Sequence, residues 1–340
     1  MTRVAVVLLN YNGEKLLAQF LTSVLEHSQE AQVVVVDNGS TDSSVELLRK
    51  SFPQVSLILF SENVGYSGGY NKALAQLDSE IVVLLNSDVE VTNGWLASPM
   101  RLLESNSDIA AVQPKILSWR NKNEFEYAGA AGGFIDSMGY PFCRGRIFTT
   151  TEKDEGQYND RVEIFWASGA CLFIKRQVYL EAGGLDEDFF THMEEIDLCW
   201  RLNRVGKSIY YDGGSSVYHV GGGTLAQGSP IKVYYNFKNG LTMLVKNLPT
   251  PELIYKIPFR LILDWAAALN FLVHGHVSNA LAVIKAHIFF LAGIGHDLRK
   301  RARSAQFGFA VRRGLILNKW IVIEYFLKKR TLYREIKNPK

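Results

Sequence analysis

Short apolar runs alternate with helix-like segments along the first hundred residues of the chain. Runs at 4–9, 33–36, 55–60 and 81–85 are typical of strands buried on both faces. The segments at 14–27 and 43–50 fit helices, and a third helix begins within 63–73. Strands and helices that alternate at this spacing build a parallel sheet, so we expect an α/β domain of the nucleotide-binding type.

The fourth apolar run ends in an amide, a hydroxyl and a carboxylate, those of Asn86, Ser87 and Asp88. Ligands of open α/β sheets bind beyond the carboxyl ends of the strands, where these side chains would lie. A carboxylate there can hold a hard divalent cation, and the cation can hold a diphosphate. The same residue types also form ordinary turns, so a metal site is one of two interpretations.

Two more strand ends carry polar side chains at the same predicted edge. Tyr11 and Asn12 follow the first strand and Asp37 follows the second, where a carboxylate can accept hydrogen bonds from a ribose or a base. The sequence has neither G-x-G-x-x-G after the first strand nor G-x-x-x-x-G-K-[ST], which argues against a Rossmann dehydrogenase and a P-loop enzyme. Gly65 and its neighbouring glycines suit phosphate binding or close packing.

The middle of the chain predicts a helix at 95–105 and a strand at 109–113, and then a long Gly-rich and aromatic segment, 119–161. We expect this segment to form loops and short strands over the ligand crevice, as a substrate lid or as irregular packing, rather than a second core. A buried strand is predicted at 165–174, followed by a short helix that ends at 183–184. Two further strands are predicted at 207–211 and 217–224.

An acidic cluster, Glu194, Glu195 and Asp197, opens the next predicted helix. Acidic residues suit a helix N-terminus because of its dipole, so a structural role is one interpretation. A carboxylate at the mouth of the crevice would also make a general base. His219, at the end of a predicted strand beside glycines, is similarly either structural or a ligand of metal or phosphate.

Composition narrows the class of protein. The 340 residues are 47% hydrophobic and 21% charged, which is typical of a globular protein of two domains or of one with an appendage. Cys143, Cys171 and Cys199 lack metal-ligand spacing and fit buried thiols in a reducing compartment. The first apolar run is too short for a signal peptide, and we expect no export signal.

The last third of the chain changes in character. Residues 296–340 carry a net charge of +10 and residues 1–295 carry −7. Apolar segments at 259–273 and 281–294 are interrupted by charged residues and are shorter than the ~20 residues of a membrane span. We expect interfacial helices whose basic clusters, at 299–301, 312–313 and 328–330, meet an anionic membrane surface. A soluble helical domain with a basic face is the alternative, and no nucleic-acid-binding motif is present.

Taken together, the motifs resemble family 2 glycosyltransferases with a GT-A fold, most closely the bacterial rhamnosyltransferase-type members. The resemblance covers 1–248 and leaves 249–340 as a helical, basic, membrane-associated region. It rests on Asp37-Asn38-Gly39-Ser40-Thr41-Asp42, Asn63 to Asn71, Leu84-Leu85-Asn86-Ser87-Asp88, Gly184-Leu185-Asp186-Glu187 with Phe189-Phe190, Glu194-Glu195 with Asp197-Leu198-Cys199 and Arg201, His219 with 221–224, and 234–239.

The resemblance implies an inverting, metal-dependent transfer from a nucleoside diphosphate sugar, dTDP-rhamnose-like or a UDP-sugar. It implies Glu195 as the general base and Mg²⁺ or Mn²⁺ held by Asp88 and His219. The donor-binding residues that it implies are Leu9, Tyr11, Asp37, Gly65, Asn71, Asn86 and Ser87. The acceptor would be a lipid-linked sugar or a polysaccharide at the cytoplasmic face of the cell membrane.

Two positions depart from the family pattern. Asn86 replaces the first carboxylate of the D-x-D element, and Glu195 replaces the usual Asp of the catalytic pair. Glu194 and Asp197 therefore remain alternatives for the base. A nucleotidyltransferase would need a Gly-rich basic loop after the first strand, which the sequence lacks. A non-catalytic nucleotide-sugar-binding or scaffold protein is the alternative from another class.

Overall fold

A computed structural model describes residues 3–221, 228–312 and 314–337. Its main sheet has nine strands, eight of them in the order β11-β13-β6-β12-β4-β1-β2-β3. The four strands that were predicted within the first hundred residues run parallel to one another, as expected. They are β1 (Val4–Asn10), β2 (Gln32–Asn38), β3 (Ser56–Phe60) and β4 (Ile81–Asn86).

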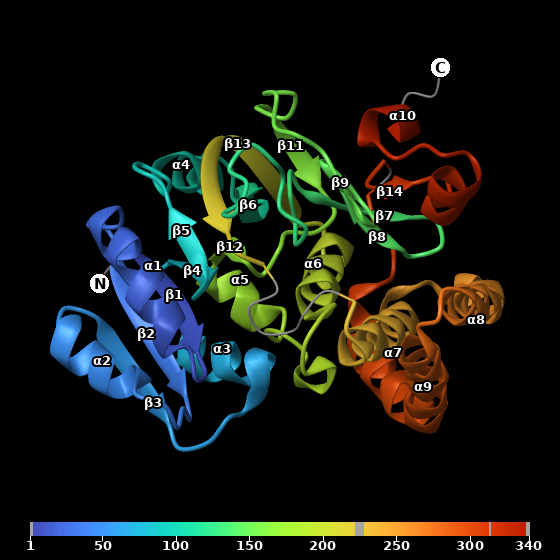
Figure 1. Cartoon of the computed structure of the whole chain (residues 1–340), viewed down its shortest axis with the longest axis horizontal. Coiled ribbons are helices and arrows are strands. Elements are labelled where there is room, and N and C mark those ends of the chain that lie inside the picture. Colours follow the sequence, from blue (N-terminus) through green and yellow to red (C-terminus); the bar gives the residue numbers. More distant parts are fainter. Residues whose placement is uncertain (1–2, 222–227, 313, 338–340) are drawn as a thin grey trace.

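Helices cover both faces of this sheet (Figure 1). Alternate residues of β1 enter opposite cores, since Val6 packs with α1 and α4 on one face and Val7 packs with α3 and α6 on the other. Burial on both faces explains the unbroken apolar runs of the strands. The helices are α1 (Glu14–Glu26), α2 (Ser44–Ser51), α3 (Gly65–Ala75), α4 (Ala97–Ser105), α5 (Arg176–Glu181) and α6 (Glu194–Arg204).

The second half of the sheet is mixed. β12 is antiparallel to both β4 and β6, whereas β13 is parallel to β6. The predicted α/β fold with helices on both faces of the sheet is confirmed, and the sheet as a whole is mixed. β5 pairs with the end of β13. These strands are β5 (Val89–Val91), β6 (Ile109–Ser118), β11 (Arg161–Ile164), β12 (Cys171–Lys175) and β13 (Ser208–His219).

Two strand predictions in this half are wrong. The strand expected at 165–174 begins only at Cys171, because the chain makes a turn at Gly169 and Ala170. Phe165 and Trp166 are apolar because they are buried in the core before that turn. The two strands expected at 207–211 and 217–224 are one strand, β13, with a β-bulge between Asp212 and Ser216. Residues 222–224 lie outside the described residues.

The segment 119–161 contributes short strands, as expected, but they join a second sheet. Its order is β10-β9-β8-β7-β14, and β14 comes from the end of the chain. Phe142 and Ile147 pack there with Ile321 and Ile336, which is a small core that the sequence analysis did not expect. The strands are β7 (Gly133–Asp136), β8 (Pro141–Cys143), β9 (Arg146–Ile147), β10 (Thr150–Thr151) and β14 (Ile316–Leu317).

The remaining helices gather at the end of the molecule opposite β1 to β3 (Figure 1). One stretch of 31 residues, Val277–Phe307, is long and apolar enough to cross a membrane by length and composition, although 39% of its most apolar window is buried. The expectation that both apolar segments are too short is therefore wrong for the second, because its helix continues past 281–294. The helices are α7 (Pro230–Asn247), α8 (Thr250–Val273), α9 (Val277–Ser304) and α10 (Tyr333–Lys337), with helical turns η1 (Glu187–Phe189), η2 (Ala305–Phe307) and η3 (Ile323–Leu327).

Candidate active site

Strand pairing brings Asp88 and His219 together. His219, the last residue of β13, stands in register with Val89 of β5, and the backbone N–H of Val220 donates to the Asp88 carbonyl at 3.1 Å. As a result, His219 Nε2 lies 3.1 Å from Asp88 Oδ1. The amide nitrogen of Asn86 lies 3.4 Å from the same ring nitrogen. The structure thus joins three predicted site residues from β4 and β13.

A second carboxylate, which was not predicted from the sequence, completes this group. Oε2 of the buried Glu126 lies 3.2 Å from His219 Nδ1, so the imidazole stands between two carboxylates. Burial alone would lower the pKa of His219, but the hydrogen bonds and charges of Asp88 and Glu126 raise it to about 10. Burial would raise the pKa of Asp88, but its hydrogen bond to His219, the charge of His219 and backbone hydrogen bonds together lower it. Glu126 lies in the Gly-rich and aromatic segment, where no motif marks it.

The chemistry of this group fits a divalent cation. Asp88 offers a hard carboxylate oxygen and His219 offers an imidazole nitrogen, a donor set that suits Mn²⁺ in particular. Glu126 stands at Nδ1, which would keep that nitrogen protonated and leave Nε2 for a metal. Within the described residues no group of three or more His, Cys, Asp or Glu side chains has metal-ligand geometry. Among these residues, Asp88 and His219 are therefore two convergent candidate ligands rather than a closed cage.

Other predicted donor residues lie at the ends of β1 and β2. Asp37 is buried, and it accepts hydrogen bonds from Asn10 Nδ2 and from the backbone N–H of Ser40, both at 3.0 Å. Tyr11 is 50% exposed just beyond β1. Leu9 packs against Gly69, where a Cβ atom would lie 2.6 Å from Leu9 Cδ1. At Gly69 the glycine therefore allows close packing between helix and strand.

Gly65, Ser87 and Asn71 have different surroundings. Gly65 has a φ of +78° and its carbonyl accepts from Asn38 Nδ2 at 3.1 Å, while Ser87 is half-buried. Asn71 donates to the Leu185 carbonyl at 2.8 Å and accepts from the Tyr179 hydroxyl at 2.7 Å and from the Leu185 N–H at 3.0 Å. Because both polar atoms of Asn71 bind protein groups, its contacts fix the turn before η1 and do not join it to Asp88 and His219.

The acidic helix α6 begins after a strained turn. Phe190, His192 and Met193 have φ angles of 61°, 65° and 76°, a region that non-glycine residues seldom adopt. The side-chain amide of Asn239 on α7 donates to three carbonyls of this segment, each at 2.9 Å, those of Phe189, Thr191 and His192. A buried amide from a neighbouring helix thus holds the entrance to α6.

Glu194 and Glu195 form a buried carboxylate pair. Within the described part of the chain, Oε2 of each residue is buried without a hydrogen-bond partner. Burial raises the pKa of both, and the neighbouring Glu195 charge raises that of Glu194 further. The backbone N–H of Gly169 opposes the rise at Glu195. The pair therefore retains a proton at higher pH than an ordinary glutamate does, which suits a group that exchanges protons.

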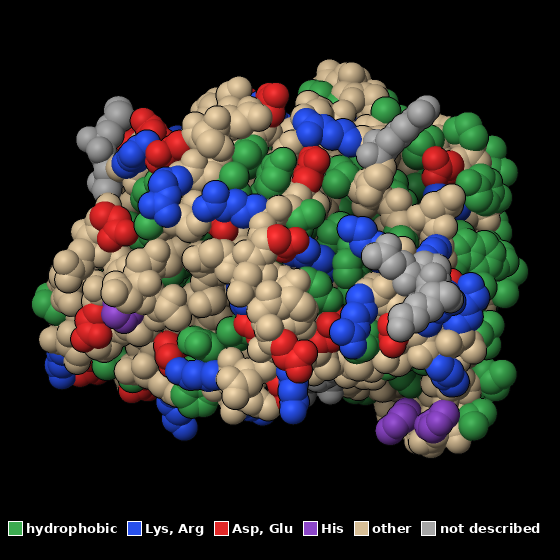
Figure 2. Space-filling model, turned by 90° about the horizontal axis from the view of Figure 1, so that it is seen from above, with side chains coloured by type: hydrophobic (Ala, Val, Ile, Leu, Met, Phe, Trp, Pro, Cys, Tyr) green, Lys and Arg blue, Asp and Glu red, His purple; other side chains and the backbone are tan. Residues whose placement is uncertain are grey.

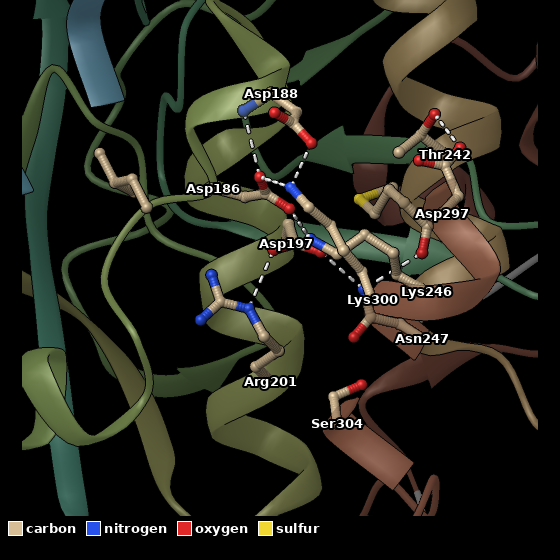
Figure 3. A network of polar contacts seen from close by, with 12 residues as sticks. Asp186, Asp188, Asp197, Arg201, Thr242, Lys246, Asn247, Asp297, Lys300 and Ser304 are labelled. Atoms are coloured by element: carbon tan, nitrogen blue, oxygen red, sulfur yellow. Dashed lines mark hydrogen bonds and ion pairs between the residues drawn. The ribbon is translucent and has the colours of Figure 1, made fainter. Parts of the chain in front are cut away.

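Asp197, about one helical turn after Glu194 on α6, contacts other side chains through both of its carboxylate oxygens (Figure 3). Its Oδ1 accepts from Asn247 Nδ2 at 2.8 Å, and its Oδ2 lies 2.9 Å from Arg201 Nε and 2.8 Å from Lys246 Nζ. The side chain is completely buried. Although burial raises the pKa of Asp197, the charges of Lys246 and Arg201 lower it overall. Asp197 is thus held as a structural anion.

Comparison with known proteins gives consistent matches. Residues 5–180 match the family model described as Glycosyl transferase family 2. N-acetylglucosaminyl-diphospho-decaprenol L-rhamnosyltransferase of Mycobacterium tuberculosis (strain ATCC 25618 / H37Rv) is 28% identical over 234 residues, 63% of this chain and 75% of that protein. Rhamnosyltransferase WbbL of Escherichia coli (strain K12) is 22% identical over 219 residues, 61% of this chain and 80% of that protein.

Two solved structures share the fold. Mannosyltransferase PcManGT from Pyrobaculum calidifontis, in complex with GDP-Man and Mn²⁺, aligns with a TM-score of 0.53 and 16% identity, over 90% of this chain and 85% of that one. GalNAc-T7 with UDP, GalNAc and Mn²⁺ aligns with a TM-score of 0.55 and 15% identity, over 74% of this chain and 49% of that one. At this identity the likeness concerns the fold alone, and the fold is of the GT-A type.

Proposed function

The chain belongs to glycosyl transferase family 2, and from this premise we propose that it transfers a sugar from a nucleoside diphosphate sugar to an acceptor hydroxyl with inversion, using Mg²⁺ or Mn²⁺. The resemblance to the rhamnosyltransferase-type members is confirmed by the two rhamnosyltransferase relatives. The approach of His219 to Asp88 at the end of β4 is the observation that carries the proposal.

We assign the metal to Asp88 and His219, and the ribose of the donor to the amide of Asn86. When bound, a divalent cation supplies Lewis-acid stabilisation of the diphosphate leaving group. Asp88 would provide one anionic oxygen, and His219 would provide Nε2 once Glu126 holds the proton on Nδ1. The two solved neighbours in complex with Mn²⁺ support this assignment of a metal.

The nucleobase is assigned to the ends of β1 and β2. Asp37 would accept a hydrogen bond from the base, with Leu9 and Tyr11 beside it, and the half-exposed Tyr11 ring is accessible for stacking. Gly65 and Ser87 would face the rest of the donor. Asn71 takes a positioning role in this proposal, since its amide binds the turn before η1.

Glu195 is assigned as the general base. It would take the proton of the acceptor hydroxyl while that oxygen forms a bond to the anomeric carbon and the bond to the diphosphate breaks on the opposite face. Its unpartnered carboxylate oxygen and raised pKa support this role. Glu194 shares both features and remains the alternative, whereas the ion pairs of Asp197 make it unsuited.

We assign the acceptor to a lipid-linked sugar or a polysaccharide at the cytoplasmic face of the membrane. The outer faces of α8 and α9 support this assignment, because they expose large hydrophobic side chains. Figure 2 shows hydrophobic side chains gathered at the end that carries these helices in Figure 1. The patch includes Ile254, Ile262, Trp265, Leu269, Val273, Leu281, Ile288 and Leu291, each between 52% and 76% exposed.

Three of the polar residues that interrupt these segments face inward, whereas Lys285 is exposed. Arg260 Nε lies 3.2 Å from Asp264 Oδ1, and His287 Nε2 lies 3.3 Å from Asp264 Oδ2, all buried between the helices and the rest of the fold. Basic residues of the tail also bind protein groups, since Arg312 and Arg330 pair with Glu163 and Glu324. Arg313 lies outside the described residues. We therefore assign the membrane contact mainly to the apolar patch.

A transfer assay tests the proposal. The purified chain is incubated with Mn²⁺, with dTDP-rhamnose or UDP-sugars, and with a short-chain analogue of N-acetylglucosaminyl diphosphate isoprenoid. The proposal expects transfer from one donor, lost in Glu195→Gln, and a product whose anomeric configuration by NMR is opposite to that of the donor. A retained configuration would contradict inversion. Binding of a donor without transfer to any acceptor would favour the non-catalytic alternative.

A further inference from the structure

Two cations from different elements flank one aromatic ring beside the candidate active site. The guanidinium carbon of Arg146, on β9, lies 4.4 Å from the centre of the Tyr127 ring. The ammonium of Lys232, in the first turn of α7, lies 5.6 Å from the same ring. Within residues 3–221, 228–312 and 314–337, neither cation forms an ion pair with a carboxylate. None of the roles proposed above uses either residue.

Arg146 is a half-buried cation that forms no ion pair within the described residues. Its Nε is inaccessible and lacks a hydrogen-bond partner in the described part of the chain. The side-chain contact that it makes is a weak one, from Nη2 to the Cys143 sulfur at 3.5 Å. Burial raises the pKa of the Cys143 thiol, so the sulfur is neutral and offers no charge in return. A charge removed from water without a counter-ion raises the free energy of the folded protein. The guanidinium of Arg146 is therefore placed to bind an anion.

The described residues around Lys232 do not neutralise the positive charges of Arg146 and Lys232. Burial and the charge of Arg146 lower the pKa of Lys232, while the charge of Glu126 opposes that change. Glu126 is the nearest anion, but its carboxylate is already engaged by His219 and by the backbone N–H of Ala128. Burial and Lys232 lower the pKa of His192 to about 4, so this imidazole is neutral.

The position of the pair relates it to the reaction. Glu126 connects it to the candidate metal ligands, because this carboxylate contacts His219 and acts electrostatically on both cations. Tyr127, the ring that both cations contact, directly follows Glu126 in the chain. The cations therefore stand beside the candidate metal ligands, on the side of His219 that Glu126 contacts. A guanidinium fork beside an ammonium matches the oxygens of a diphosphate.

We propose that Arg146 and Lys232, with the Tyr127 ring between them, form a second diphosphate subsite that binds the acceptor rather than the donor. The inference rests on the proposed function, in which the donor diphosphate meets the cation held by Asp88 and His219. The metal cation neutralises the donor diphosphate. Arg146 and Lys232, which form no ion pair among the described residues, therefore require a second anion. The M. tuberculosis relative, whose name specifies a diphospho-decaprenol sugar, indicates that acceptors of this chemistry occur among similar proteins.

Isothermal titration with two probes separates the two subsites. Inorganic pyrophosphate and farnesyl diphosphate in EDTA probe the acceptor subsite, and UDP or dTDP with Mn²⁺ probes the donor subsite. The double variant Arg146→Gln/Lys232→Gln should bind the metal-free probes about tenfold more weakly or worse, and Mn²⁺-nucleotide within about twofold of wild type. Asp88→Ala should show the reverse pattern. Lys50→Gln, which neutralises an exposed lysine on α2, should change neither.

The possible outcomes decide between the interpretations. Equal loss of both probes in the double variant would assign the cations to the donor and overturn the proposal, as would unchanged binding of pyrophosphate. If wild type binds no nucleotide with Mn²⁺ but pyrophosphate binding still depends on the two cations, the proposed donor function fails while the anion subsite stands. Should the double variant not fold, Lys232→Gln and the charge-preserving Arg146→Lys replace it, with loss expected for the first and near-normal binding for the second.

Discussion

Lys246 reaches from α7 to within 2.8 Å of Asp197 Oδ2 on α6, and so ties one of the three acids of the helix N-terminus to the protein interior. The same ammonium lies 2.5 Å from Asp186 Oδ2, and Lys300 of α9 contacts Asp186 as well (Figure 3). The acids Glu194, Glu195 and Asp197 are close in sequence but differ in their partners. Of these three, only Glu194 and Glu195 have a buried carboxylate oxygen without a hydrogen-bond partner among the described residues.

Asp197→Asn should destabilise the protein by about 3 kcal/mol, because it leaves buried cations without an anion. Urea unfolding at pH 7 measures the loss. The folded-state pKa of Asp197 is lowered, so its stabilisation is present above the unfolded value of 3.8 and disappears as pH falls through the folded pKa. The difference between variant and wild type should therefore shrink below pH 4. The half-exposed Asp188→Asn serves as control and should cost less than about 1 kcal/mol.

Glu195→Gln should lower the turnover rate at least about a hundredfold without weakening donor binding, because the general base is lost. Glu194→Gln is the matched control, since it changes a buried carboxylate in the same turn and should retain most of the activity. The measurement is steady-state transfer with each variant at saturating donor. The opposite ranking of the two variants would move the role of the base to Glu194.

The same two variants should be more stable than wild type at pH 8. The folded-state pKa values of Glu194 and Glu195 are raised above 4.5, so the stability that they contribute is present below pH 4.5 and is lost as pH rises through the folded values. Replacing either with Gln removes the cost of a buried charge at high pH. Thermal melting at pH 8 and at pH 5 checks this, and a gain as large at pH 5 as at pH 8 would exclude the titration as its cause.

Glu126→Gln should weaken Mn²⁺ binding in the presence of a nucleoside diphosphate by about 10- to 100-fold. The reason is that Glu126 orients His219 through Nδ1 without itself being an assigned metal ligand. Titration of Mn²⁺ followed by electron paramagnetic resonance measures the affinity. The half-buried Glu124→Gln controls for charge, and affinity equal to wild type in Glu126→Gln would remove the residue from the site.

Trp265→Asp combined with Leu269→Asp should reduce binding to vesicles containing anionic phospholipid at least about tenfold, because both side chains project from the apolar face of α8. Co-sedimentation measures binding, and circular dichroism checks the fold. Val205→Asp, at an exposed hydrophobic position on the loop before β13, is the control and should bind as wild type does. Undiminished binding by the double variant would rule out this face as the membrane contact.

Sequence patterns predicted the structure best where the pattern of a single strand or helix was sufficient to identify it. The parallel strands β1 to β4 were predictable because burial on both faces leaves unbroken apolar runs such as 81–85. The second sheet was not, since strands of two to four residues are too short to show a period, and β14 pairs with β7 across about half the length of the chain. The strands predicted separately at 207–211 and 217–224 are one strand because β13 continues through a bulge between Asp212 and Ser216.

In the candidate site, too, residues at strand ends could be predicted, whereas residues whose role depends on tertiary contacts could not. Asp88 and His219 were identified from the strand ends on which they lie, and the structure brings them together. Glu126 was missed because its role depends on contact with His219 across a segment without a motif. Likewise, the partners that distinguish Asp197 from Glu195 come from α7, about fifty residues later, and only tertiary packing reveals them.

The central claim is that Asp88 and His219 hold the cation that binds the donor diphosphate. Isothermal titration of dTDP, UDP and GDP, with and without Mn²⁺, tests it most directly on wild type and Asp88→Ala. The account predicts binding of one nucleotide that requires Mn²⁺ and is lost in the variant, which would also identify the base. Binding that is equally strong without Mn²⁺, or that survives in Asp88→Ala, would contradict the claim.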